Sequence, residues 1–313
     1  MSSAPPVDDL ESYTAVVPTL GQRPTLAATI TSLRHQPFPP EEIIVVLPEG
    51  VGAPQGLPTG LRYVWAPRSS SAQRNRGLQL AATPYVLLVD DDIRVRPGTP
   101  DALRHALRQR PSAVLAAANL VGDPVLPTAT NLTYRLLGLG YHNPFHGTSR
   151  LRWSGHSVIR LVPRATESVG VTHLCCTLLR RSLTSVVLLD ETIDGYVLGE
   201  DLDFGARARQ HGQLLSVPHA LADILDEPST APEDPRAVAV LHGHVLSYFR
   251  WRHKRPGTFG TLAWGWSHVG QLLVLVVRSV RTRDVAALNG YLTGLRSCLA
   301  QIASETRNGA VPN

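Results

Sequence analysis

The residues best suited to chemistry follow an apolar run, Tyr85–Val89, which ends in Asp90, Asp91 and Asp92. Side chains alternate along an extended strand, so we expect Asp90 and Asp92 to point one way and Asp91 the other. Adjacent carboxylates repel one another unless a cation or hydrogen-bond donors gather beside them. Mg²⁺ or Mn²⁺ suits such a group, because hard cations prefer oxygen ligands. A solvated acidic turn after a buried strand is the alternative interpretation.

A second acidic group, Glu200, Asp201 and Asp203, opens a helix that is predicted to run to His211-Gly212. Acids in the first turn of a helix stabilise its dipole, which gives these three residues a purely structural explanation. Between the two acidic groups, periodicity fades from Gly122 to Gly170, where glycines separate aromatic and basic side chains. This stretch is either a binding loop or an irregular connection, since long loops in compact domains are usually functional or disordered.

The elements that must position these residues alternate between strands and helices. Strands are predicted at Thr14–Thr19, Glu42–Leu47, Leu61–Trp65 and Tyr85–Asp90, with helices opening near Arg23 and Ser69. Such alternation predicts a mostly parallel α/β sheet flanked by helices. Ligands bind beyond the carboxyl ends of the strands in these sheets, and the acidic triplet lies at that edge.

The later elements suggest a division of the chain. A helix at Pro97–Arg110, a strand at Ser112–Val121, an apolar stretch at Val171–Arg181 and a last strand at Leu214–Val217 would complete a catalytic domain over 13–225. A helical C-terminal extension is predicted over 235–304, with helices at Arg236–Lys254, Thr258–Arg281 and Asp284–Ser304.

Composition excludes several classes of protein. A hydrophobic content of 43% and a mean hydropathy of -0.02 are those of a folded globular chain. The pI of about 9.4 comes almost wholly from arginine, because Lys254 is the only lysine. These arginines are scattered rather than clustered, so we expect no nucleic-acid partner, whereas anionic nucleotides or an anionic membrane surface remain plausible.

The cysteines and the N-terminal stretch bear on location. Cys175, Cys176 and Cys298 are too few and wrongly spaced for a disulfide framework or a zinc site. Residues 1–12 are polar and lack the apolar core of a secretory signal, so we expect a cytoplasmic protein.

Four motifs stand in a fixed order: Val16-Val17-Pro18-Thr19 with Arg23-Pro24; Gln73-Arg74-Asn75-Arg76-Gly77; Val89-Asp90-Asp91-Asp92; and Gly199-Glu200-Asp201-Leu202-Asp203. In this order and spacing the chain resembles the family 2 glycosyltransferases over roughly residues 13–218, and weakly beyond. The resemblance implies the GT-A (nucleotide-diphospho-sugar transferase) fold and, usually, inversion at the transferred sugar. Residues 13–121 would form the nucleotide-sugar-binding half, and 122–225 the acceptor-binding half.

The resemblance also implies an activity. A single hexosyl or deoxyhexosyl group would pass from a UDP-, GDP- or dTDP-sugar to a glycan or polyprenyl-linked acceptor, in cell wall or polysaccharide biosynthesis. Mg²⁺ or Mn²⁺ would assist. A nucleotidyltransferase of related fold is a competing interpretation, although Leu20-Gly21-Gln22 is poor in glycine for a phosphate-cradling loop. A non-catalytic nucleotide-sugar-binding protein is another.

Site roles follow from the resemblance residue by residue. The donor would meet side chains after the first strand, on the second helix and in the acidic triplet: Pro18, Thr19, Arg23, Arg74, Asn75, Asp90 and Asp91. Asp92 would hold the metal, with Asp90 beside it. Asp201 would be the catalytic base, and Glu200 would assist in binding the acceptor.

Two departures from the family pattern leave questions open. Leu47-Pro48 stand where many members carry acids after the second strand, so the nucleotide is not identified. Many members also complete the metal site with a histidine after the last core strand. His219 and Asp223 are the candidates here, although a lone surface histidine is the simpler reading of His219. Trp153 is a further candidate for contact with the acceptor.

The tail carries a possible membrane contact. Residues 259–277 contain no Asp, Glu, Lys or Arg, and arginines flank the stretch on both sides. Basic flanks at both ends fit a helix lying in the membrane interface better than one crossing it, at the inner face of the cell membrane. A buried helix packed against protein is the alternative. Arg250-Trp251 matches part of a motif of processive polysaccharide synthases, but Ser247 replaces its glutamine and we expect no processivity.

Overall fold

The computed structural model of the protein describes residues 11–121, 127–143, 148–160, 165–191, 199–225, 234–253 and 257–307. Contacts divide the chain into two compact units. Unit 1 consists of Met1–Pro124, Val162–Gly195 and Phe204–Glu227, and unit 2 of Val125–Leu161, Tyr196–Asp203 and Pro228–Asn313. The residues predicted as an acceptor-binding half, 122–225, are therefore shared between the two units.

Unit 1 is built on a mixed sheet whose order, within the described residues, is β10-β12-β6-β11-β4-β1-β2-β3. Strands β1, β2, β3 and β4 are parallel, as the alternation of strands and helices predicted. Strands β10 and β11 run antiparallel to their neighbours, and a short β5 pairs antiparallel with β12. The strand bounds are β1 Tyr13–Pro18, β2 Glu42–Pro48, β3 Arg62–Ala66, β4 Tyr85–Val89, β5 Ile93–Val95, β6 Ala113–Val121, β10 Glu167–Val169, β11 Cys176–Arg180 and β12 Gln213–Ile224.

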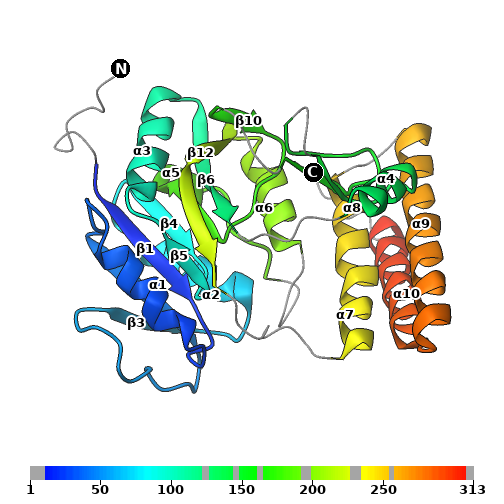
Figure 1. The fold of residues 1–313 in the computed structure, drawn as a ribbon, viewed down its shortest axis with the longest axis horizontal. Helices are drawn as coiled ribbons and strands as arrows, with labels where there is room; N and C mark the ends of the chain where they lie inside the picture. The colour runs from blue at the N-terminus through cyan, green and yellow to red at the C-terminus, as the bar shows by residue number, and fades with distance from the viewer. Residues whose placement is uncertain are drawn as a thin grey trace. The chain divides into compact units, whose positions relative to one another are not determined.

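Helices cover both faces of this sheet (Figure 1). On one face α1 (Thr25–Arg34) and α3 (Thr99–Gln109) pack Ile30 and Leu103 into a core with Ala15 and Val17 of β1. On the other, α2 (Ser70–Leu80), α5 (Arg181–Thr184) and the end of α6 (Glu200–Ala208) pack against Val16. Successive side chains of β1 point to opposite faces and are buried on both, so the strand packs against both helical layers.

The sheet changes winding direction at β1, which pairs with β2 on one side and β4 on the other. A crevice for ligands in an open α/β sheet forms at such a switch point, outside the carboxyl ends of the strands. Thr19 directly follows β1 and Asp90 directly follows β4. The sheet therefore brings the first and third motifs to one edge.

Unit 2 contains the helices of the tail and a small sheet of order β7-β9-β8. Helix α10 packs along α7 and α9, and Figure 1 shows the three side by side. Gly294 permits the close approach of α10 to α7, since a Cβ there would lie 2.1 Å from the Val240 carbonyl oxygen. The bounds are α4 Thr128–Leu136, β7 Tyr141–Asn143, β8 Arg150–Leu151, β9 Ser157–Arg160, α7 Pro235–Leu241, the π-helix η2 His242–Leu246, α8 Ser247–His253, α9 Thr258–Thr282 and α10 Ala286–Arg307.

The sequence located most of these elements, but it did not predict the short β5 and α5, and α6 ends at Ala208 rather than at His211-Gly212. Three further differences concern the last strand, the stretch without periodicity and the tail. The last strand continues past Val217 to Ile224, and the register shift between Val217 and Leu221 accommodates Pro218. The stretch without periodicity contains α4 and the small sheet, whose strands are too short for a periodic signal. The first predicted tail helix has a π-helical turn at its centre.

Candidate active site

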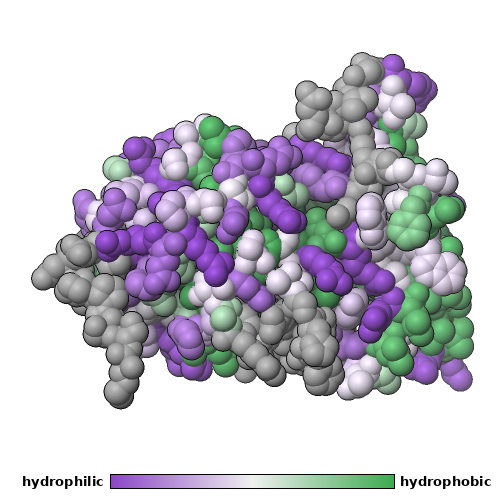
Figure 2. Space-filling model, turned by 90° about the horizontal axis from the view of Figure 1, so that it is seen from above, coloured by the Kyte–Doolittle hydropathy of each residue, from purple (hydrophilic) through white to green (hydrophobic). Residues whose placement is uncertain are grey.

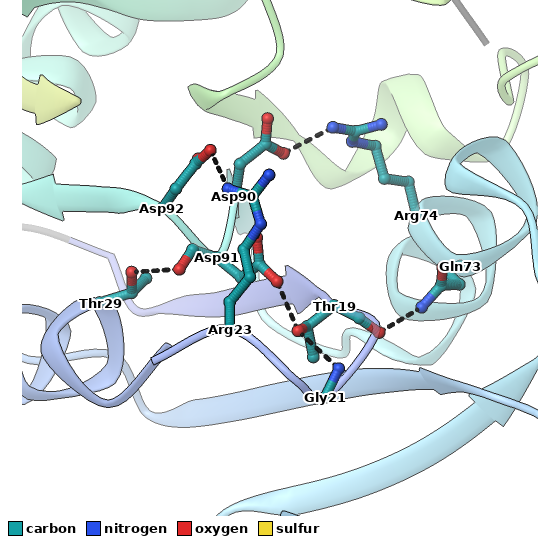
Figure 3. A network of polar contacts seen from close by, with 9 residues as sticks. All are labelled: Thr19, Gly21, Arg23, Thr29, Gln73, Arg74, Asp90, Asp91 and Asp92. Atoms are coloured by element: carbon teal, nitrogen blue, oxygen red, sulfur yellow. Dashed lines mark hydrogen bonds and ion pairs between the residues drawn. The ribbon is translucent and has the colours of Figure 1, made fainter. Parts of the chain in front are cut away.

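The acidic triplet forms a turn at the end of β4, and each of its three carboxylates contacts neighbouring polar side chains (Figure 3). Asp90 accepts a hydrogen bond of 2.5 Å from Arg74, which lies on α2. Asp91 accepts a bond of 2.5 Å from the Thr19 hydroxyl. Arg23 lies between Asp91 and Asp92 and forms an ion pair with each. The expected alternation of side chains ends with the strand at Val89, so Asp91 and Asp92 share one arginine.

These contacts set the protonation of the triplet. Burial raises the pKa of Asp91 to about 6. The hydrogen bond from Thr19 and the charge of Arg23 lower this pKa, whereas the neighbouring acids Asp92 and Asp90 raise it. Burial acts in the same direction on Asp90, but the charge and hydrogen bond of Arg74 outweigh it and hold the pKa of Asp90 below its usual value. Arg23 and Arg74 therefore offset the repulsion between the adjacent carboxylates.

The Gln73–Gly77 motif of α2 holds the switch point together. The Gln73 side-chain amide donates to the carbonyl oxygens of Thr19 and Val46, at 2.8 Å each, and so ties β1 to β2 (Figure 3). Gly77 lies against β1, where a Cβ would come within 2.1 Å of a Val16 methyl group. Close packing of α2 on β1 is what presents Arg74 to Asp90.

Asn75, predicted to face the nucleotide sugar, is buried inside unit 1. Its side-chain amide donates to the Leu189 carbonyl oxygen at 2.9 Å and to Glu191 at 2.5 Å, and its oxygen accepts from the Leu189 NH at 2.8 Å. Asn75 thus holds Leu189 and Glu191, which follow β11 in the chain, against the Gln73–Gly77 motif of α2. Sequence reasoning assigned Glu191 no role, because no local pattern signals a partner more than a hundred residues away.

The remaining predicted donor-site residues are at or near the ends of the first two strands. Pro18 is the last residue of β1, and the NH of Thr19 donates to the Val46 carbonyl oxygen at 3.0 Å. Leu47-Pro48 belong to β2 and are buried. Of these residues, Thr19 contacts the acidic triplet through Asp91, and the contacts of Pro18 and Thr19 with a nucleotide stay a prediction.

The carboxylates provide a donor set that fits a divalent cation. In the part of the chain that the structure describes, no cluster of three or more His, Cys, Asp or Glu could hold a metal ion by itself. Asp90 and Asp92 nevertheless keep 23% and 27% of their side-chain surface exposed, beside their arginines. Mg²⁺ needs one or two carboxylates when substrate phosphates and water complete its shell, so Asp90 and Asp92 suffice.

The two candidates for completing that shell lie on β12. His219 is exposed within the irregular register of the strand. Both carboxylate oxygens of Asp223 accept hydrogen bonds from Arg96, at 2.6 to 3.1 Å, which joins β12 to the segment after β5. Asp223 therefore has a structural partner, and a metal-binding role for either residue remains a prediction.

The second acidic group lies in unit 2 at the start of α6. Gly199 precedes it with φ 86, a left-handed conformation that favours glycine, and a Cβ there would lie 2.7 Å from Leu246. Glu200 and Asp201 are half-buried, and Asp201 accepts a bond of 2.8 Å from the NH of Leu202. Asp203 is buried, and it accepts a bond of 2.6 Å from Nε2 of His253. Of the three acids, Glu200 and Asp201 keep the access to solvent that a reacting group needs.

Trp153, the candidate for acceptor contact, also lies in unit 2. It is 63% exposed, and its ring meets Phe259 edge to face with 5.7 Å between the centroids. Arg250, from the partial synthase motif, is buried and hydrogen-bonded to His156 at 2.9 Å. Nothing in these contacts gives Arg250 access to a substrate.

No family model and no curated protein sequence matches the chain. Its fold does match solved structures. The crystal structure of GalNAc-T7 with UDP, GalNAc and Mn²⁺ superposes with a TM-score of 0.54 at 13% identity, covering 85% of this chain and 56% of that one. Staphylococcus aureus TarS 1–349 in complex with UDP-GlcNAc gives 0.53 at 12% identity, covering 91% and 79%. This chain has the GT-A fold.

The GT-A fold was the prediction from the four motifs, and the solved structures confirm it. At 12–13% identity the likeness concerns the fold, and the chain spans little more than half the length of the GalNAc-T7 chain. Within a GT-A fold, the edge of the sheet after β1 and β4 is where this chain gathers Thr19, Arg23 and the acidic triplet.

Proposed function

We propose that the protein is a glycosyltransferase that moves one sugar from a nucleotide-sugar donor to an acceptor. The observation that carries the proposal is the group Thr19, Arg23, Asp90, Asp91 and Asp92 at the switch point of a GT-A sheet. GalNAc-T7 and TarS, which share the fold, were solved with UDP or UDP-GlcNAc. The resemblance to family 2 favours an inverting hexosyl or deoxyhexosyl transfer from a UDP-, GDP- or dTDP-sugar.

Asp90 and Asp92 would hold Mg²⁺ or Mn²⁺. When bound, the cation supplies Lewis-acid stabilisation of the leaving nucleoside diphosphate. Arg23 and Arg74 add positive charge at the same edge, where an anionic diphosphate binds favourably. Thr19 and Asp91 would contact the nucleoside.

On the acceptor side, Asp201 would act as general base. The acceptor hydroxyl oxygen bonds to the anomeric carbon, the bond from that carbon to the diphosphate oxygen breaks, and the hydroxyl proton passes to the Asp201 carboxylate. Glu200 would orient the acceptor. Asp203 is a poorer candidate for the base, because His253 already occupies its buried carboxylate.

We also propose peripheral attachment to the inner face of the cell membrane. Among the described residues, α9 is the one helix long and apolar enough to cross a membrane, and 28% of its apolar window is buried. Many of its large apolar side chains are exposed, including Leu262 at 66% and Leu273 at 50%. An interfacial helix accounts for this exposure, and a glycan or polyprenyl-linked acceptor would then be met at the membrane.

The experiment is a product assay with UDP-, GDP- and dTDP-sugars, with and without Mn²⁺, using a bacterial lipid and glycan extract as acceptor. Release of the nucleoside diphosphate together with transfer of labelled sugar supports the proposal, and inverted anomeric configuration supports the mechanism. Release of pyrophosphate would indicate a nucleotidyltransferase instead. Binding of a nucleotide sugar without turnover would indicate a non-catalytic protein.

A further inference from the structure

Unit 2 contains an open cavity of about 530 Å³ between the end of α4, the β8 hairpin and the start of α9. Its walls are mainly apolar, and aromatic rings from two of these segments meet there, Trp153 and Phe259. Trp266 lines the same cavity, and its indole NH donates to the Leu136 carbonyl oxygen at 2.9 Å. The volume lies in the range of small-molecule sites, which extends from about 300 to 1,000 Å³.

Positive charge collects at this cavity, and the structure shows no acidic partner for Arg135 or Arg150 among the residues that it describes. Arg150 and Arg152 line it, and Arg135 lies on the adjoining α4. Arg152 is held in place, since it donates to the carbonyl oxygens of Leu139 at 2.7 Å and of Arg135 at 2.9 Å. Burial lowers the pKa of Arg152. Tyr141 acts in the opposite direction, whereas the positive charges of Arg135 and Arg150 lower this pKa further. Arg135 and Arg150 are exposed and form no ion pair with a described residue. An anion would therefore be drawn to this rim.

The cavity is continuous with an exposed apolar surface. Phe259 and Trp266 line the cavity and are themselves 66% and 51% exposed on α9. Figure 2 shows hydrophobic side chains gathered over the region of α9, with hydrophilic ones beside them. The exposed apolar side chains of α4 and α9 are Leu132, Leu136, Phe259, Leu262, Trp266, Val269, Leu273, Val276, Val277 and Val280. Apolar side chains of α9 therefore belong both to the cavity wall and to the exposed surface beside it.

The hairpin that lines the cavity and the acidic group at the start of α6 both contact the same helix, α8. On one side Gly155, in the β8–β9 hairpin that carries Trp153, packs so closely on Arg250 that a Cβ would come within 2.3 Å of its side chain. At its end His253 binds Asp203, two residues after Asp201. Helix α8 therefore joins the hairpin that lines the cavity to the start of α6 within unit 2.

We propose that this cavity is an acceptor subsite for a lipid phosphate, with the hydrocarbon tail among Trp153, Phe259 and Trp266 and the phosphate at Arg150. The assignment rests on the proposed glycosyltransferase function and narrows its acceptor to a lipid-linked one. A free glycan would find few hydrogen-bonding groups on these walls, whereas a tail with a phosphate matches both the apolar lining and the arginines at the rim.

The test uses the full-length chain and farnesyl phosphate, measured by equilibrium dialysis below its micelle concentration. Farnesol supplies the tail alone and inorganic phosphate the anion alone. Arg150→Gln removes the cation at the rim, Ala263→Trp fills the cavity, and Phe259→Ala removes a wall at an exposed position that the fold does not need. Arg296→Gln, an exposed arginine on α10, is the control for loss of charge from unit 2.

Farnesyl phosphate should bind more tightly than farnesol, and inorganic phosphate should not compete. Arg150→Gln should lower the affinity for farnesyl phosphate by about fivefold, as expected for the loss of one exposed charge pair, and leave the affinity for farnesol unchanged. Ala263→Trp and Phe259→Ala should lower the affinity for both ligands, and Arg296→Gln should change neither affinity. Equal affinity for farnesol and farnesyl phosphate, competition by free phosphate, or unchanged binding in both cavity variants would overturn the proposal.

Nucleotide-sugar binding with Mn²⁺ is measured in the same proteins, because the donor residues lie in unit 1. A chain that binds the nucleotide sugar but not farnesyl phosphate rejects the lipid subsite alone. A chain that binds farnesyl phosphate but no nucleotide sugar rejects the glycosyltransferase proposal and, with it, the role of the cavity as an acceptor subsite.

Discussion

Asp203 and His253 are joined by a hydrogen bond of 2.6 Å between Oδ1 and Nε2, although they lie 50 residues apart in the sequence. Arg252 reaches the same carboxylate oxygen at 3.4 Å. The carboxylate is almost completely buried, with 1% of its side chain exposed. This contact distinguishes two acids that lie two residues apart: Asp203 has a buried structural partner, whereas Asp201 is the acid that we propose as the general base.

We expect Asp201→Asn to lower turnover by about 10²–10⁴-fold, the usual contribution of a general base, and to leave donor binding intact. Asparagine keeps the size and the capping ability of aspartate but cannot accept the proton. Steady-state turnover and nucleotide calorimetry check this. Product of retained anomeric configuration, or near-normal turnover, would falsify the role.

Two matched variants sharpen that result. Asp284→Asn makes the same change at the start of α10, where Asp284 accepts from the Ala286 NH at 2.8 Å, and should leave turnover unchanged. Asp203→Asn should instead lower the free energy of unfolding by about 2 kcal/mol, because it weakens a buried hydrogen bond to a charged group. A chemical unfolding curve distinguishes this loss of stability from a loss of turnover.

Asp92→Asn should weaken metal-dependent nucleotide binding by at least about tenfold while the fold persists, since one of two exposed carboxylates is lost. Calorimetry with UDP, GDP and dTDP, with and without Mn²⁺, measures the effect. Glu42→Gln, which breaks an exposed pair with Arg62 elsewhere in unit 1, is the control. Equal affinities with and without metal, in wild type and variant alike, would show that the assignment is wrong.

Gly77→Ala should lower the free energy of unfolding by about 2 kcal/mol, because its methyl group would overlap Val16 and push α2 from β1. Donor binding should fall as well, since the shift moves Arg74 away from Asp90. Gly205→Ala on α6 is the matched control, with its nearest contact at an ordinary 3.7 Å from Leu214. Equal stability of the two variants in thermal unfolding would contradict this account of the motif.

Unit 2 should lose stability in acid because of two buried histidines. Burial, reinforced by the charge of Arg250, lowers the pKa of His268 to about 3 and that of His156 well below its usual value. His268 also contacts Tyr291 at 2.7 Å and the ring of Trp264. A histidine kept neutral in the fold binds a proton when unfolded, so its stabilising effect is complete above about pH 6.5 and falls as the pH drops.

The measurement is the midpoint of thermal unfolding between pH 7.5 and pH 5. His268→Gln should reduce the pH slope of stability by up to about 1.4 kcal/mol per pH unit, the value for one proton. His219→Gln, at an exposed position, should leave the slope unchanged. The explanation fails if both variants show the wild-type slope.

Attachment to membranes should depend on the exposed face of α9. In flotation with liposomes, the full-length protein should bind anionic vesicles more than zwitterionic ones, and Leu262→Gln with Leu273→Gln should reduce binding by about tenfold or more. Leu299→Gln on α10, where the side chain is 47% exposed, is the control. Wild-type protein that stays monodisperse and ignores both kinds of vesicle would rule out the interfacial helix.

The sequence determined the features that depend on near neighbours in the chain. The continuous apolar runs of β1 and β4, the helical period of α1 and α3, and the abrupt change from Val89 to Asp90 are local, so they predicted the sheet edge and its acids. The order of four short motifs then predicted a GT-A fold, which the solved structures share.

The tertiary structure alone decided which groups meet. The sequence could not pair Asp90 with Arg74, Asn75 with Glu191, or Asp203 with His253, because each contact depends on how whole elements pack and not on local spacing. The sequence also could not predict that cations lie beside the apolar cavity of unit 2, since Arg150 and Phe259 come together only when the hairpin folds against α9. Local periodicity specifies elements, whereas packing of distant side chains selects the chemistry at their ends.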